Sequence, residues 1–305
     1  MNKLTIIMYH YVRDFSKKNT ENIKGLDIKS FIKQLDFLQK NYDIIDPSDL
    51  ILKKKKFNEK NCLLTFDDGH KDCTDYILPE LKKRKLKGCF FPVGITIKER
   101  QLLDVHIIQH ILARENNINK LVKKINEECL KSGISETQIK ENYKNYAKSN
   151  AYDSEEIIYF KRMLQIVLPE KIRSRILYDF FERIFNISRK EMAEELYMNF
   201  DEIKKLQDEG MYIGSHTYNH SWLPKLDKNS QKKEIYKSLE FLKEIDAPVE
   251  NWIMCYPWGE YNKDTIEILK ETGCSYGFTA KPGVADLTRS EFELSRKDTN
   301  EFIET

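Results

Sequence analysis

The chain has 305 residues, of which 51 are Lys or Arg and 49 are Asp or Glu, so its formal net charge is only +2. Because the charges nearly balance, no strong field attracts the chain to nucleic acid or to an anionic lipid surface, and we expect no nucleic-acid partner. The sequence has no run of 18 apolar residues, so no membrane span is predicted.

Short apolar runs rich in β-forming residues alternate with amphipathic helical patterns, which favours parallel βα units. The predicted strands are Leu4–Tyr9, Tyr42–Ile45, Cys62–Phe66, Gly88–Val93, Met211–Ser215, Trp252–Tyr256 and Ser275–Thr279. The predicted helices are Ile28–Lys40, Ile77–Leu86, Phe200–Glu209, Ser230–Ile245 and Lys263–Thr272. Gly210 and Gly273 follow two of these helices, where a left-handed cap is expected. Seven strands with intervening helices indicate an α/β barrel, whose functional residues lie at the C-terminal ends of its strands.

The alternation is interrupted from about residue 96 to residue 196, where the pattern is helical almost throughout. Because predicted strands flank this segment on both sides, we interpret it as a helical insertion within a single domain of residues 1–305. We expect it to act as a lid or a substrate-shaping subdomain. Within it, His106 and His110 share one helical face, and we interpret them as a helix surface or lid contact in preference to a second metal pair.

Cysteine usage indicates a reducing compartment. The six cysteines are scattered without a Cys-x-x-Cys motif, and several lie inside apolar strand-like runs, where Cys behaves as a small hydrophobic residue. The N-terminal segment has only a brief apolar stretch and no small-residue cleavage site, unlike a signal peptide. We therefore expect a cytoplasmic protein.

Adjacent carboxylates end the third predicted strand, in the segment Thr65-Phe-Asp-Asp-Gly-His70. Asp67 and Asp68 cannot point the same way from an extended backbone, but a turn at Gly69 lets both reach one cavity. By itself such an Asp-Asp-Gly sequence is typical of a simple turn.

Two histidines follow another predicted strand, in the segment Ser215-His-Thr-Tyr-Asn-His220. One carboxylate together with His216 and His220 can hold a Zn²⁺-like ion and leave a position open for water. The second carboxylate then remains free to act as a base. The two segments together therefore predict a metal-dependent hydrolase.

A third segment, Cys255-Tyr-Pro-Trp-Gly259, follows the strand predicted at Trp252–Tyr256. In this order the three segments resemble the motifs of polysaccharide deacetylases of the NodB-homology type, carbohydrate esterase family 4. The segments Met8-Tyr-His-Tyr-Val12 and Leu294-Ser-Arg-Lys-Asp298 are similar to flanking motifs of one bacterial branch of that family. The resemblance covers roughly residues 1–95 and 200–300 and implies a distorted (β/α)₇-type barrel.

The resemblance also implies a division of roles. Asp67 matches the catalytic base, and the metal ligands are Asp68, His216 and His220. The metal is one divalent ion, with Zn²⁺ expected first and Co²⁺, Ni²⁺, Mn²⁺ or Fe²⁺ as alternatives.

The backbone N–H of Trp258 matches the donor that stabilises the oxyanion. Its neighbours in the turn, Pro257 and Gly259, are expected to contact substrate.

The sequence departs from the family pattern at two positions. Cys255 stands where many members have an Arg that orients the catalytic aspartate, and Arg296 stands where many have the His of a Leu-x-His motif. Arg296 is permanently charged and a poor proton donor, so we expect it to pair either with Asp67 or with substrate. His10, at the end of the first strand, is the candidate general acid; the alternative is a merely polar residue at a strand end.

The predicted function is metal-dependent removal of an N-acetyl group from an amino sugar. The absence of an export signal favours a nucleotide- or lipid-linked sugar or another glycan precursor over a wall polysaccharide. Two alternatives stay open: hydrolysis of another non-peptide C–N bond, and a catalytically weak carbohydrate-binding protein that kept the metal.

Overall fold

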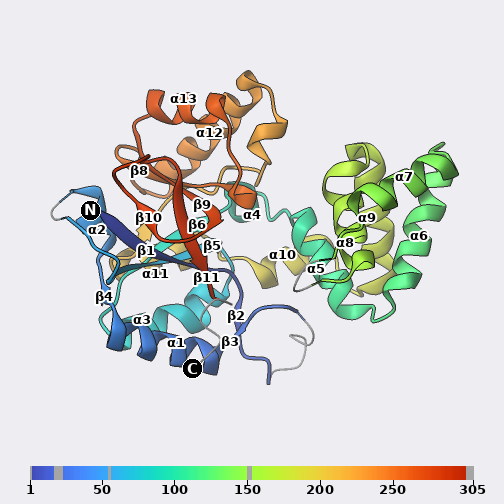
Figure 1. Ribbon diagram of the computed structural model, residues 1–305. Coiled ribbons are helices and arrows are strands. Elements are labelled where there is room, and N and C mark those ends of the chain that lie inside the picture. Colours follow the sequence, from blue (N-terminus) through green and yellow to red (C-terminus); the bar gives the residue numbers. More distant parts are fainter. Residues whose placement is uncertain (1, 17–22, 54–55, 150–152, 300–305) are drawn as a thin grey trace. The chain divides into compact units, whose positions relative to one another are not determined.

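The computed structural model describes residues 2–16, 23–53, 56–149 and 153–299 (Figure 1). The chain divides into two compact units. The first contains residues 1–15, 25–101 and 193–305, and the second contains residues 16–24 and 102–192.

The first unit is built on a curled parallel sheet with the strand order β7-β6-β5-β1-β11-β9-β8 (Figure 1). The bounds of these strands are β1 Lys3–Tyr9, β5 Asn61–Asp68, β6 Cys89–Pro92, β7 Tyr212–Ile213, β8 Trp252–Cys255, β9 Cys274–Pro282 and β11 Leu294–Asp298. A bridge between Ser215 and Met254 joins the two ends of this order. In it, the Ser215 amide donates to the Ile253 carbonyl at 3.0 Å and the Cys255 amide to the Ser215 carbonyl at 2.8 Å. The sheet is thereby drawn into a barrel.

The predicted (β/α)₇-type barrel is confirmed, and each of the seven predicted strand segments overlaps a strand of the structure. The segment predicted at Tyr42–Ile45 forms only β4, Asp43–Ile44, which pairs with β5 outside the main order. The seventh strand of the main order is β11, which was not predicted and which pairs with β1 and β9. Its residues after Leu294 are all polar, including the buried Arg296, so a search for apolar runs could not reveal this strand.

Three further short strands complete the β-structure: β2 Val12–Arg13, β3 Leu26–Asp27 and β10 Ala285–Asp286. Of these, β2 and β3 form a separate two-stranded sheet, and β10 pairs antiparallel with β1.

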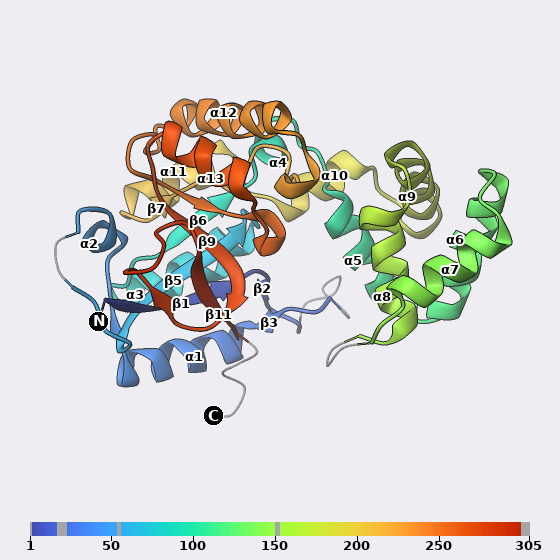
Figure 2. The ribbon, with the colours of Figure 1, turned by 45° about the horizontal axis from the view of Figure 1, so that its top comes forward.

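Helices cover the outside of the sheet. Their bounds are α1 Ile28–Asn41, α2 Pro47–Ile51, α3 Leu78–Lys83, α4 Gly94–Lys98, α11 Phe200–Asp208, α12 Lys228–Glu244 and α13 Lys263–Glu271, with a π-helix, η1 Cys73–Ile77, and the 3₁₀ turns η3 Leu223–Lys225 and η4 Pro257–Gly259. In both views α1 lies along one side of the sheet, and α12 and α13 lie along the opposite side (Figure 1, Figure 2). The predicted caps are confirmed, since Gly210 and Gly273 both have φ of +72° directly after the caps of α11 and α13.

The core fills the barrel interior. Strand β5 is buried along its whole length, as expected of a parallel sheet covered on both faces. Large interior side chains come from several strands: Leu4, Ile6, Leu63, Phe91, Ile253, Phe278 and Leu294. A second apolar cluster joins β8 and β9 to α12 and α13, and it includes Trp252, Met254, Ile235 and Ile268. Together the two clusters fix the strand ends that carry the functional side chains.

The second unit is helical. Its elements are α5 Asp104–Arg114, α6 Ile118–Lys131, α7 Glu136–Tyr146, α8 Glu155–Arg162, η2 Met163–Val167 and α9 Glu170–Ile184, and α10, Arg189–Leu196, runs from this unit into the first. His106 and His110 both lie on α5, where His106 is buried and the His110 ring packs edge-on against Phe185. Throughout the described part of the chain, none of the helices combines the length and apolar character needed to cross a bilayer.

The turn after β8 is packed directly against β9. Gly259 has φ of +70°, and a Cβ added there would lie 2.3 Å from the Ala280 backbone nitrogen. Gly273 has nearly the same φ, +72°, but the Cβ of an alanine at that position would have no atom within 4 Å, so the two glycines differ mainly in packing.

We therefore expect Gly259→Ala to lower the free energy of unfolding by about 1–3 kcal/mol more than Gly273→Ala, because only the methyl group added at position 259 would clash with β9. Both variants share the cost of a left-handed alanine. Urea denaturation followed by circular dichroism measures the difference. Equal losses in the two variants would contradict the packing argument.

Candidate active site

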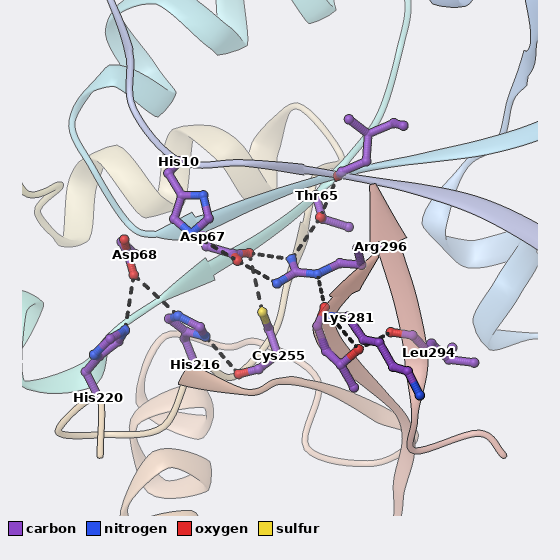
Figure 3. Close-up of polar contacts among 12 residues, drawn as sticks. His10, Thr65, Asp67, Asp68, His216, His220, Cys255, Lys281, Leu294 and Arg296 are labelled. Carbon is purple, nitrogen blue, oxygen red and sulfur yellow. Dashed lines mark hydrogen bonds and ion pairs between the residues drawn. The ribbon is translucent and has the colours of Figure 1, made fainter. Parts of the chain in front are cut away.

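The predicted functional side chains gather at the C-terminal ends of neighbouring strands (Figure 3). Asp67 and Asp68 end β5, and His10 directly follows β1. The two motif histidines, His216 and His220, follow β7. Parallel strands present these ends at the same edge of the barrel, which is why segments far apart in sequence meet there.

Asp68 and the two motif histidines form a cluster able to hold a metal ion. The Oδ1 atom of Asp68 lies 3.3 Å from His216 Nε2 and 3.4 Å from His220 Nε2. Metal–ligand bonds of about 2.0–2.1 Å at tetrahedral angles separate two ligand atoms by about 3.3–3.4 Å. The spacing of these donors therefore fits a tetrahedrally coordinated divalent ion.

The tautomer of His216 is set by its second ring nitrogen. His216 Nδ1 lies 2.8 Å from the carbonyl oxygen of Cys255, which can only accept a hydrogen bond. Nδ1 therefore carries a hydrogen, and Nε2, the nitrogen that would bind a metal ion, faces Asp68.

Asp67 lies beside this cluster and is held by Arg296. Nη1 and Nη2 of Arg296 donate to Oδ1 and Oδ2 of Asp67 at 2.9 and 2.8 Å (Figure 3). Both side chains are buried, with exposures of 1% for each residue. Two partners were predicted for Arg296, Asp67 or the substrate, and in the structure Arg296 pairs with Asp67.

Two further groups face the same carboxylate. The Cys255 thiol donates to Asp67 Oδ1 at 3.4 Å, and His10 Nε2 lies 3.7 Å from Asp67 Oδ2. The His10 side chain is 43% exposed, so it can reach both solvent and Asp67. Cys255 lies on β8, whereas Arg296 binds the aspartate from β11.

Burial and charge oppose each other at this pair. Burial raises the pKa of Asp67, but the positive charge of Arg296, together with the neighbouring His10 and the hydrogen bonds from Arg296, outweighs it, and the pKa lies below its ordinary value. Burial also raises the pKa of the Cys255 thiol, so the thiol keeps its hydrogen and can donate. Asp67 is therefore an ionised carboxylate at neutral pH.

The Pro-Trp-Gly turn borders the histidine pair. The Trp258 ring stacks on Trp222 with centroids 5.3 Å apart and lies 5.6 Å from the ring of His220. Trp258 has φ of +63° in the short turn η4, in which Pro257 is buried. This backbone conformation is one that a tryptophan rarely adopts.

Left-handed backbone is concentrated around the cluster. Asp68, Thr217, His220 and Trp258 have φ of +69°, +59°, +56° and +63°. Such conformations cost on the order of 1–3 kcal/mol each and persist only where the surrounding structure imposes them. These backbone conformations set the directions in which the side chains of Asp68 and His220 leave the chain.

Three groups that contact the site residues had no predicted role. Thr65 Oγ1 accepts from Arg296 Nη1 at 3.1 Å and donates to the Ile7 carbonyl, and the Thr279 carbonyl accepts from Arg296 Nε at 2.7 Å. The third is His70, whose Nε2 lies 3.5 Å from Asp68 Oδ2. Its position in the sequence, directly after Asp67-Asp68-Gly69, could have indicated that His70 lies near the site.

Comparison with known proteins agrees with the motifs. A family model described as polysaccharide deacetylase matches residues 54–135 and 181–277. Among curated proteins, the putative polysaccharide deacetylase YxkH of Bacillus subtilis is 28% identical over 107 residues, which are 35% of this chain. That match spans only 38% of the relative's length.

Solved structures share the fold. The deacetylase PplD of Streptococcus pyogenes, determined in complex with acetate, aligns with a TM-score of 0.59 and 18% identity over 97% of this chain and 92% of its own. IcaB from Ammonifex degensii aligns with a TM-score of 0.55 and 17% identity over 98% and 91% of the two chains. At these identities the likeness establishes the barrel fold alone.

We expect Arg296→Met to lower the free energy of unfolding at neutral pH by about 3–5 kcal/mol, because it leaves the buried carboxylate of Asp67 unpaired. The double variant Arg296→Met/Asp67→Asn should recover a large part of the loss, since no buried charge then remains. Chemical denaturation of the wild type, both single variants and the double variant measures the coupling.

Lys82→Met is a matched control, because it breaks an exposed ion pair, between Lys82 and Glu209 at 2.6 Å, and should cost far less. If the double variant is no more stable than Arg296→Met, the charge argument is wrong.

Proposed function

The chain belongs to the polysaccharide deacetylase family, and from this premise we propose that it is a metal-dependent hydrolase that removes the N-acetyl group of an amino sugar. The observation that carries the proposal is the placement of an ionised carboxylate, Asp67, beside a donor set of one carboxylate and two imidazoles. A binding protein would need the donor set but would have no use for a second, oriented carboxylate.

Asp68, His216 and His220 would hold the ion. Two imidazoles and one carboxylate suit Zn²⁺, while Co²⁺, Ni²⁺, Mn²⁺ and Fe²⁺ are accepted by similar donors. When bound, such an ion supplies a Lewis acid and lowers the pKa of a coordinated water towards about 7.

Asp67 is proposed as the general base that takes a proton from the attacking water. Its bidentate pair with Arg296 keeps it ionised and fixes the plane of its carboxylate. We propose that Arg296 acts through Asp67 and that it does not itself contact substrate, because its guanidinium is buried and already engaged.

The turn at Pro257–Gly259 would bind the reacting acetyl group. The Trp258 N–H is proposed to donate to the oxyanion that forms on the carbonyl, a contribution of roughly 3–4 kcal/mol for a well-placed donor. The left-handed backbone of Trp258 makes this amide part of a rigid turn. Pro257 and Gly259 would shape the same wall of the site.

The departing amine needs a proton, and His10 is the proposed donor. Its imidazole is partly exposed and lies within 3.7 Å of the base, so one substrate can contact both groups. The substrate is proposed to be an N-acetylated amino sugar that is part of a polysaccharide or is linked to a nucleotide or a lipid. The acetate bound to the streptococcal neighbour is the product that this reaction would release.

The adjacent carboxylates provide a matched test of the two roles. We expect Asp67→Asn to reduce acetate release by at least about 10²-fold while about one equivalent of metal stays bound. Asp68→Asn should lose the metal itself. Acetate release from a panel of N-acetylated sugars, oligosaccharides and nucleotide sugars, with metal analysis of each purified variant, measures both.

Metal retention by Asp68→Asn would contradict the ligand assignment. Tight sugar binding by the wild type with no acetate released from any member of the panel would identify a binding protein instead.

For His10→Ala we expect a fall in kcat of about 10²–10⁴-fold with unchanged metal content, because the leaving amine loses its proton donor. The pH profile of kcat should lose the limb that reports the acid. Wild-type kcat across the whole pH range would exclude His10 from this role.

A further inference from the structure

His70 is a fully buried histidine that faces the opposite side of the metal-binding carboxylate. Its exposure is 0%, and its Nε2 lies 3.5 Å from Asp68 Oδ2, whereas His216 and His220 face Asp68 Oδ1. We propose that His70 is a positioning residue that donates from Nε2–H to Asp68 Oδ2 and thereby orients Asp68 for the metal. The inference rests on the metal site proposed above.

The ring of His70 is held by aromatic neighbours. It stacks on Tyr11 with centroids 4.0 Å apart and an interplanar angle of 21°, and it lies nearly parallel to Tyr197 at 5.9 Å. The Arg13 guanidinium lies over the Tyr11 ring at 4.5 Å and pairs with Asp72 at 3.0 Å. The imidazole therefore belongs to a packed, ordered column and cannot swing away from Asp68.

The backbone around His70 is fixed as well. His70 pairs with Tyr197 in an antiparallel bridge. On either side of it, the Gly69 carbonyl accepts from the Met198 amide at 3.0 Å, and the Lys71 amide donates to the Leu196 carbonyl at 2.9 Å. A side chain locked in both ring and backbone can hold a neighbouring carboxylate in one orientation.

The chemistry of the pair assigns the donor. An ionised carboxylate only accepts, so in the proposed contact His70 Nε2 carries the hydrogen that it donates to Oδ2. With Oδ2 engaged by His70, Asp68 presents Oδ1 alone to the two histidines. Groups that orient a metal ligand in this way are typically worth 10–100-fold in metal affinity.

Three substitutions test the proposal. His70→Phe keeps a stacking ring without a donor, His70→Gln places an amide N–H near the position of Nε2, and His70→Asn has an amide that is too short to reach it. We expect the dissociation constant for Zn²⁺, measured on metal-free protein by competition with a chelating dye, to rise about 10–100-fold in His70→Phe and His70→Asn. His70→Gln should stay within about threefold of the wild type.

The Co²⁺-substituted proteins give a second readout. The visible d–d spectrum should change in His70→Phe and His70→Asn and match the wild type in His70→Gln, because it reports ligand arrangement and not overall stability. If His70→Phe does not fold, the comparison of Gln with Asn carries the test alone. Thermal unfolding of the metal-free variants identifies any general loss of stability.

Wild-type affinity in His70→Phe or His70→Asn would overturn the proposal, as would a His70→Gln protein as weak as the others. If the metal site proposed above does not exist, the result is different: the wild type itself would then bind no metal at Asp68.

Discussion

The buried ion pair between Asp67 and Arg296 is the interaction on which the site depends. A carboxylate with 1% exposure is costly unless it is paired and hydrogen-bonded. Arg296 provides the opposite charge and the hydrogen bonds. Its guanidinium also donates to the Thr65 hydroxyl and to the Thr279 carbonyl, which hold it in place. The pair connects β5 to β11 across β1, so it is at once a contact between strands and the source of an ionised carboxylate.

Around this pair, rigidity is provided by the backbone. Asp68, Thr217, His220 and Trp258 have left-handed backbones that are each strained, and such strain persists only where the surrounding packing imposes it. The hydrogen bond from His216 to the Cys255 carbonyl couples the two segments across the bridge that closes the barrel. The pairing of the strands and the position of the His216 ring are therefore set by adjoining contacts.

Much of the fold could be predicted from the sequence, because apolar runs and glycine caps are local signals. The alternation of strands and helices predicted the barrel, and three motifs in order predicted the family, which is confirmed. Strand β11 was not predicted because its residues from Ser295 to Asp298 are all polar, and β4 is shorter than predicted because only Asp43 and Ile44 pair with β5. The position of His70 in the site could not be predicted, because its ring is held by Tyr11 and Tyr197, which are distant from it in the sequence.

The separation of Asp67 and Arg296 along the chain, 229 residues, has a consequence for biosynthesis. While the chain is being made, β5 emerges early, and its carboxylate has no guanidinium to pair with until nearly the whole barrel has left the ribosome. Contacts of such long range form late and slow the folding of the domains that need them. The site is thus completed by the last strand of the barrel to be translated, and a nascent chain that stops before β11 carries the aspartate without the charge that keeps it ionised.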